Sequence, residues 1–153
     1  MQLTELIPLE RIACNVGANS KKRALEELSE LIAGSEGRIT SSEVFDSLLN
    51  RERLGGTGVG HGVAIPHGRL KNGTITLGAL IKLDHAIDYD AIDNQPVDLL
   101  FAMVVPEEST EEHLQALAKI AAMFNDAGMR EQMRSAKSPV DLHELVRQWQ
   151  QTH

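Results

Sequence analysis

The stretch VAIPHG, residues 63–68, places a histidine directly after a short apolar run. The run predicts a brief buried strand, which Pro66 would end because proline has no backbone N–H, and Gly68 would let the chain turn away. His67 is therefore predicted to be presented at a strand end rather than packed in a core. A neutral imidazole offers one nucleophilic nitrogen and one N–H, so this histidine is suited to nucleophilic chemistry.

A glycine-rich stretch precedes this histidine. Within LGGTGVGHG, eight positions hold five of the 12 glycines of the chain, namely Gly55, Gly56, Gly58, Gly60 and Gly62. Such a loop could bring several backbone N–H groups close to an anion, and a flexible surface loop is the equal alternative. The Gly-Lys-Ser/Thr ending of a P-loop is missing. A helix before the glycines and a strand after them reverse the order that a dinucleotide-binding motif needs.

Two arginines and a second histidine complete the candidate site. Arg51 and Arg53 lie at the end of the helix that leads into the glycines. We expect one of them to be a partner of the helix dipole, while the other could direct its guanidinium at a phosphate. His113 is predicted in the first turn of a later helix, where an anion is also favoured, although a lone histidine there often has no chemical role. All these features describe one ligand, a phosphoryl group.

Helices and strands that could position these residues alternate along the chain. Amphipathic spacing predicts five helices. Their starts are marked by capping boxes from Thr40 and from Ser109 to Glu112, and by Ser138 as N-cap with Pro139 after it. The predicted helices are 20–33, 40–53, 109–124, 126–136 and a last one from 139 onward. Strands are predicted at 63–66, 74–83 and 97–105, the last two apolar enough to be covered on both faces. The fold class is therefore α/β, a single domain over 1–153 with a small mixed central β-sheet flanked by helices.

Composition narrows the class of protein. A formal net charge of −7 over 153 residues argues against a nucleic-acid partner, which would need clustered Lys and Arg. No apolar run approaches the roughly 20 residues of a membrane span, and no signal peptide opens the chain, so we expect a cytoplasmic protein without membrane insertion. Cys14 is the only cysteine, which excludes an intramolecular disulfide, and we expect it to pack as a small apolar residue.

From Glu52 to Gly68 the chain reads ERLGGTGVGHGVAIPHG. This resembles the histidine signature of the type-2 enzyme IIA (EIIA) domain of the bacterial phosphoenolpyruvate-dependent phosphotransferase system. A second stretch, DAIDNQPVDLLFAMVVP at 90–106, is similar to a core strand of that family and the turn before it, and looks most like the nitrogen-regulatory branch. The order of elements agrees along nearly the whole chain.

The resemblance implies a phosphotransferase in which His67 is the phosphoacceptor and forms a tele-phosphohistidine intermediate. It also implies that His113 and Arg51 contact the phosphoryl group. The implied donor is a histidine phosphocarrier protein of the HPr or NPr type. Regulatory proteins such as transporters or sensor kinases are the implied targets of a phosphorylation-dependent signal, and a homodimer stays open.

Phosphoryl transfer needs mainly positioning and charge stabilisation, so neither a cofactor nor a metal is expected. Thr57, with the backbone amides of Gly58 and Gly60, is the further predicted phosphate contact. Relatives often have serine where this chain has Gly56, which leaves Thr57 as the hydroxyl donor. His61 stands at a free position of the signature; it could share the phosphate or titrate beside it, but we expect it to face water.

Three alternatives remain at this point. A sugar-specific component of the fructose or mannitol type would pass its phosphoryl group to the EIIB part of a permease. A purely structural regulator would carry a histidine that never reacts. A zinc hydrolase from another class would use His61, His67 and His113 as ligands and keep one position open, although no HExxH helix is present.

Overall fold

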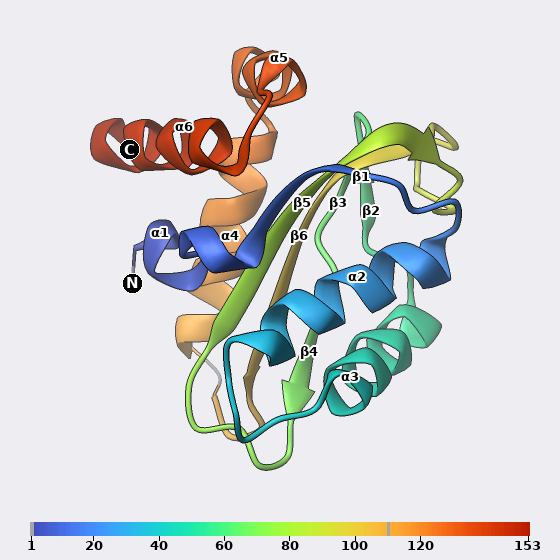
Figure 1. Ribbon diagram of the computed structural model, residues 1–153, viewed down its shortest axis with the longest axis vertical. Coiled ribbons are helices and arrows are strands. Elements are labelled where there is room, and N and C mark those ends of the chain that lie inside the picture. The colour runs from blue at the N-terminus through green and yellow to red at the C-terminus, as the bar shows by residue number, and fades with distance from the viewer. Residues whose placement is uncertain (1, 110) are drawn as a thin grey trace.

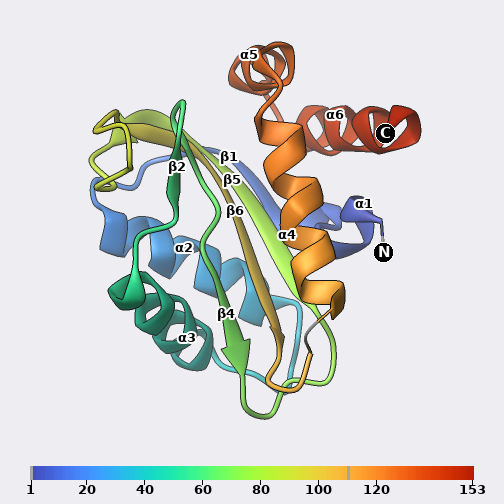
Figure 2. The same ribbon diagram turned by 180° about the vertical axis from the view of Figure 1, so that it is seen from behind.

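In this computed structural model, a six-stranded sheet separates two groups of helices, and the described residues are 2–109 and 111–153 (Figures 1 and 2). The helices are α1 (Leu3–Leu6), α2 (Lys21–Gly34), α3 (Ser41–Leu54), α4 (Glu111–Phe124), α5 (Ala127–Ser135) and α6 (Pro139–Thr152), with a 3-10 turn at Leu9–Arg11. The strands are β1 (Ile12–Val16), β2 (Gly58–Gly60), β3 (Val63–Ala64), β4 (His67–Leu70), β5 (Leu77–Ile87) and β6 (Val97–Pro106).

The strands form a mixed sheet in the order β1-β5-β6-β3-β2, and β4 also pairs with β6. Strands β5 and β6 are antiparallel, whereas β1 is parallel to β5, and β3 and β4 are parallel to β6. Alternate residues of β6 point to opposite faces: Leu100 and Val104 pack in the core under α2 and α3, and Phe101 and Met103 in the core under the other helices. The predicted mixed sheet, covered on both faces, is confirmed.

Most predicted helices are confirmed, and two of their caps are present. The Thr40 hydroxyl accepts a hydrogen bond from the Glu43 N–H, and the Glu43 carboxylate accepts one from the Thr40 N–H. Ser138 caps α6 through one bond, because its hydroxyl accepts from the Asp141 N–H. The predicted capping box from Ser109 to Glu112 includes Thr110 and the side chain of Glu112, which lie outside the described residues. No helix in the described part of the chain is long and apolar enough to cross a membrane.

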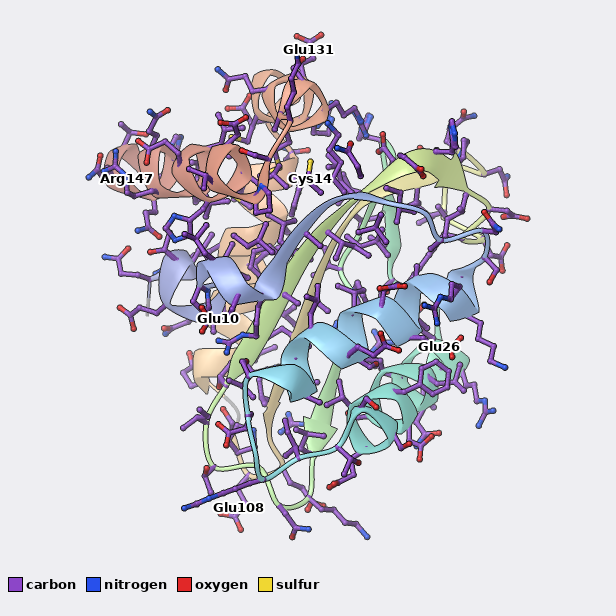
Figure 3. The ribbon with its side chains drawn as sticks, viewed as in Figure 1. Glu10, Cys14, Glu26, Glu108, Glu131 and Arg147 are labelled. Atoms are coloured by element: carbon purple, nitrogen blue, oxygen red, sulfur yellow. The ribbon has the colours of Figure 1, made fainter. Side chains whose placement is uncertain are left out.

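The outer surfaces of the helices carry charge. Figure 3 shows Glu26 on α2, Glu131 on α5 and Arg147 on α6 pointing away from the sheet. Cys14 of β1 instead lies beneath the α5–α6 connection, half-buried, with its Sγ 3.7 Å from the Ala136 carbonyl oxygen. The expectation that Cys14 packs in the N-terminal segment is confirmed.

The prediction that Pro66 ends the strand was wrong. Val63 lies beside Leu99 of β6 and His67 beside Met103, so the register runs unchanged through the proline. Met103 N donates to the Pro66 carbonyl at 3.0 Å. Proline removes only one donor, on the side that faces β6, and this divides one strand into β3 and β4 without turning the chain.

The interpretation of Gly68 as a turn residue was also wrong. Gly68 lies inside β4, and a Cβ there would stand 2.2 Å from Ser47 Oγ and 2.8 Å from the Ser47 carbonyl oxygen. The missing side chain therefore lets α3 approach β4 closely. Because of this approach, residues of α3 come next to His67.

Candidate functional site

A cavity of about 450 Å³ lies where β4 meets α3 and the first turn of α4. Its lining residues are Ser47, Asn50, Arg51, Leu54, His67, Gly68, Arg69 and His113. The structure thus brings together three of the predicted site residues, His67, His113 and Arg51, from three different elements. Figures 1 and 2 show α3 and α4 on opposite sides of β4, so the cavity lies at the edge of the sheet.

The ring of His67 is oriented by the backbone of its own strand. Ile65 N donates to the Thr57 carbonyl at 2.9 Å, on the side of the strand that faces away from β6. The Ile65 carbonyl points to the same side and lies 3.0 Å from His67 Nδ1. Nδ1 must therefore carry the proton, and the opposite nitrogen, Nε2, keeps its lone pair. No hydrogen bond within the described residues occupies Nε2.

The surroundings of His67 keep it neutral. Burial lowers the pKa of His67, and the charges of Arg51 and Arg69 lower it further, whereas the Ile65 hydrogen bond and Glu52 act in the opposite direction. A lowered pKa favours the uncharged ring at neutral pH. The neutral ring therefore keeps one nitrogen, Nε2, with an available lone pair.

His113 faces His67 across the cavity. The two ring centroids are 5.5 Å apart and the rings are tilted by 55°. Only 8% of His113 is exposed, and its Nδ1 is buried without a hydrogen-bond partner in the described part of the chain. Burial, followed by the charges of His67 and Arg69, lowers the pKa of His113. A proton on the buried Nδ1 would be an unpaired donor, so the neutral ring carries its proton on Nε2 and can donate from there.

Arg51 has a structural contact as well as a place in the site. It lies in the last turn of α3, and its Nη1 donates to the Gly55 carbonyl at 2.7 Å, just beyond the end of the helix. Arg51 thus combines a contact at the end of the helix with a place in the cavity lining, two positions that we expected of different arginines. Arg53 is exposed and does not line the cavity.

The structure does not bring Thr57, Gly58 and Gly60 into the cavity. Thr57 is buried; its N–H donates to Glu52 Oε1 at 3.2 Å, and its hydroxyl donates to the other oxygen of the same carboxylate. Lys21 completes this network with an ion pair of 2.8 Å to Glu52. Both donors of Thr57 are therefore already used at the end of α3.

The glycines after Thr57 do not form the predicted loop. Gly58 and Gly60 lie in β2, which pairs with β3. A Cβ on Gly58 would stand 2.8 Å from Ala91 Cα, so close packing requires glycine there. Gly62 has a φ of +78° in the tight turn between the two strands, where glycine is the least strained residue.

His61 lies at that turn, away from His67 and His113. It is exposed, as expected, and it lines a different cavity, with residues of α4. Among residues 2–109 and 111–153, leaving aside the side chain of Glu112, no group of three His, Cys, Asp or Glu side chains is placed to hold a metal ion. The three-histidine arrangement of the zinc alternative is therefore not formed.

Sequence reasoning missed three polar residues of the cavity: Ser47, Asn50 and Arg69. Helical spacing could have found the first two, because positions 47, 50, 51 and 54 follow one face of a helix that ends beside the signature. Arg69 could have been found from its place two residues after His67, once the segment is known to be a strand.

Comparison with known proteins gives a consistent result. The sequence profile of the family described as "Phosphoenolpyruvate-dependent sugar phosphotransferase system, EIIA 2" matches residues 5–149. The nitrogen regulatory protein of Pseudomonas aeruginosa is 42% identical over 146 residues, which cover 95% of each chain. The crystal structure of the nitrogen regulatory protein IIA-Ntr of Neisseria meningitidis superimposes with a TM-score of 0.89 at 38% identity, over 94% of this chain and 98% of that one. The mannitol IIA of Escherichia coli shares the fold, with a TM-score of 0.75 at 21% identity over 90% of this chain and 96% of the other.

Proposed function

The chain belongs to the EIIA type-2 family of the phosphoenolpyruvate-dependent sugar phosphotransferase system, in its nitrogen-regulatory branch, and we propose that it accepts a phosphoryl group on His67 and signals the phosphorylation state to regulatory partners. One observation carries this proposal: Nδ1 of His67 is held by the Ile65 carbonyl, which leaves Nε2 free in a cavity lined by Arg51 and His113. The donor is a phosphorylated histidine phosphocarrier protein, and the proposed location is the cytoplasm.

The transfer step needs no group outside the two proteins. The lone pair of His67 Nε2 attacks phosphorus, and the N–P bond of the donor breaks with its electron pair returning to the donor imidazole. The ring of His67 gains positive charge as the new bond forms. The Ile65 carbonyl then accepts a hydrogen bond from a more acidic Nδ1–H, and this stabilises the charge that develops.

The phosphoryl oxygens are stabilised by the groups on either side. Arg51 supplies the positive charge and His113 donates from Nε2, which suits a transfer that depends on positioning and charge. Thr57 acts indirectly, because its bonds to Glu52 fix the end of the helix that carries Arg51. Gly58 and Gly60 act in the same indirect way, through the close packing of β2.

Labelling of the wild-type protein tests the function. Incubated with the phosphorylated carrier, it is expected to gain one phosphoryl group that is labile to acid and stable to base. A histidine of ordinary pKa is half protonated at pH 6.5, whereas His67, because its pKa is lowered, is more than half neutral there. The labelling rate at pH 6.5 should therefore exceed half the rate measured at about pH 8, and fall only in more acidic solution. An NMR titration of the His67 ring separates this effect from titration of the donor, and a midpoint at or above the ordinary value would contradict it.

The surface around the site suits a partner that senses phosphorylation. Leu54 lines the cavity and is 85% exposed, and Leu114, next to His113, is 61% exposed. A partner packed on this apolar surface buries a neutral imidazole easily, but it would have to desolvate a phosphoryl dianion. We therefore expect transporter or sensor-kinase targets to prefer the unphosphorylated form.

Binding of a copurified target measures this preference. Its affinity is compared for wild-type protein, for phosphorylated protein and for His67→Ala, which presents the uncharged surface permanently. His67→Ala should bind like the unphosphorylated wild type. Equal affinity for all three forms would leave His67 as a relay only, as in a sugar-specific component that passes phosphate to an EIIB.

A further inference from the structure

A second arginine, Arg69, shares the cavity with His67. Both residues lie on β4 two positions apart, so their side chains leave the strand on the same face. Arg69 Nη1 donates to the Glu107 carbonyl at 2.8 Å and, at a shorter distance, to the Ser109 carbonyl. These carbonyls belong to the turn between β6 and α4, the helix that carries His113. Figure 3 places Glu108, in the middle of this turn, at the end of the molecule toward which β4 points.

Among the described residues, the hydrogen-bond partners of the Arg69 guanidinium are these two neutral carbonyls. Three arginines, Arg23, Arg134 and Arg147, pair with carboxylates, and the distance between Arg134 and Asp98 is 3.1 Å. Arg69 forms no ion pair within the described residues. Its charge nevertheless reaches the site, because it contributes to lowering the pKa of both His67 and His113. Arg69 is exposed, lies beside His67 and binds only neutral carbonyls among the described residues. A phosphoryl group on His67 would therefore be a stronger hydrogen-bond acceptor for its guanidinium.

We propose that Arg69 is a second phosphoryl-binding arginine, held by the carbonyls of Glu107 and Ser109 before phosphorylation and transferred to the phosphoryl oxygens on His67 afterwards. The inference rests on the proposed phosphorylation of His67. Hydrogen bonds between ionised partners are about twice as strong as neutral ones, and a guanidinium can give two of them in parallel to a phosphoryl group. The dianion therefore competes successfully with two backbone carbonyls.

The exchange has a structural consequence at the turn. Without Arg69, the turn keeps two backbone hydrogen bonds, from Glu107 N to the Leu70 carbonyl at 3.1 Å and from Ser109 N to the Pro106 carbonyl at 3.0 Å. Loss of the side-chain contacts makes opening of these bonds easier. Phosphorylation of His67 on β4 thereby loosens the turn that leads into α4. This turn lies close in sequence to the exposed Leu114, which a partner would contact.

Hydrogen exchange measured by mass spectrometry tests the proposal, on full-length protein whose phosphate content has first been determined. In the wild type, phosphorylation should speed exchange at the amides of residues 107–109 by about tenfold, the change expected when a charge-assisted hydrogen bond is lost. In Arg69→Gln these amides should exchange fast already, phosphorylation should change nothing there, and the phosphohistidine should hydrolyse faster. Arg53→Gln is the matched control, because it removes the same charge from an exposed position outside the cavity, and it should behave as the wild type.

Arg69→Lys separates charge from geometry. Lysine keeps the charge but not the planar fork, so the lifetime of the phosphohistidine should be partly restored while exchange at residues 107–109 stays fast. Full labelling of wild-type His67 without any change at these amides would overturn the proposal and leave the carrier function intact. A phosphorylation-dependent change of the same size in Arg69→Gln would also overturn it. Absence of label on the wild type would contradict the carrier function itself, and the role of Arg69 with it.

Discussion

His67→Ala is expected to lose all acid-labile label while keeping its fold. Alanine has no nucleophilic nitrogen, and the other histidine that lines the cavity, His113, donates from its Nε2 in our scheme. The ring is only half-buried, and its one hydrogen bond within the described residues goes to the Ile65 carbonyl. Its removal should lower the free energy of unfolding by no more than about 1.5 kcal/mol.

The measurement combines phosphate labelling with a thermal melt of each variant. His61→Ala is the matched control, because His61 is exposed and lines a different cavity, and it should be labelled at the wild-type rate. Label that persists in His67→Ala and disappears in His61→Ala would reverse the assignment of the acceptor.

The second large effect concerns the groups around the acceptor. Arg51→Ala and His113→Ala each remove a charge-assisted contact or a hydrogen bond to the phosphoryl group, worth about 1.5–3 kcal/mol in a partly dry site. Single-turnover transfer from the phosphorylated carrier should slow by tens- to hundreds-fold, yet full labelling should still be reached because His67 is intact. Arg51→Lys should fall between the wild type and Arg51→Ala, since it keeps the charge without the planar fork.

Arg53→Ala controls for the loss of a cation at the same helix end and should transfer at the wild-type rate. Unchanged rates in both Arg51→Ala and His113→Ala would reduce Arg51 to a partner of the Gly55 carbonyl. They would likewise reduce His113 to a buried histidine without a chemical role.

Much of the architecture follows from local sequence signals. Helix α3 begins at its capping box, and the apolar strands β5 and β6 are covered on both faces as predicted. Strand β5 extends four residues beyond the predicted end, to Ile87. The prediction stopped at Leu83 because the apolar pattern ends there and the three residues that follow are exposed. Prediction from the apolar pattern fails where polar residues continue in a strand.

The errors at the site have one physical cause. Pro66 and Gly68 carry strong local preferences for a turn, but pairing with β6 holds the segment in register through both residues. Gly58 likewise serves a contact with Ala91, which is distant in sequence. Such contacts exist only in the folded chain and leave no local signal. The glycines therefore suggested a phosphate-binding loop. Thr57 was predicted to bind phosphate for the same reason, although both of its donors are bonded to Glu52.

The broken edge strand also bears on how copies of this protein avoid one another. An exposed strand edge offers free donors and acceptors on which a second chain can add a strand, and this leads to aggregation. Here the Ile65 carbonyl, which faces away from β6, is capped by the His67 ring, and the Arg69 carbonyl accepts from Ser47 Oγ at 2.8 Å. The contact that orients the His67 ring thus also closes the edge of the sheet against strand addition, so the geometry of the site and the protection of this edge depend on the same few atoms.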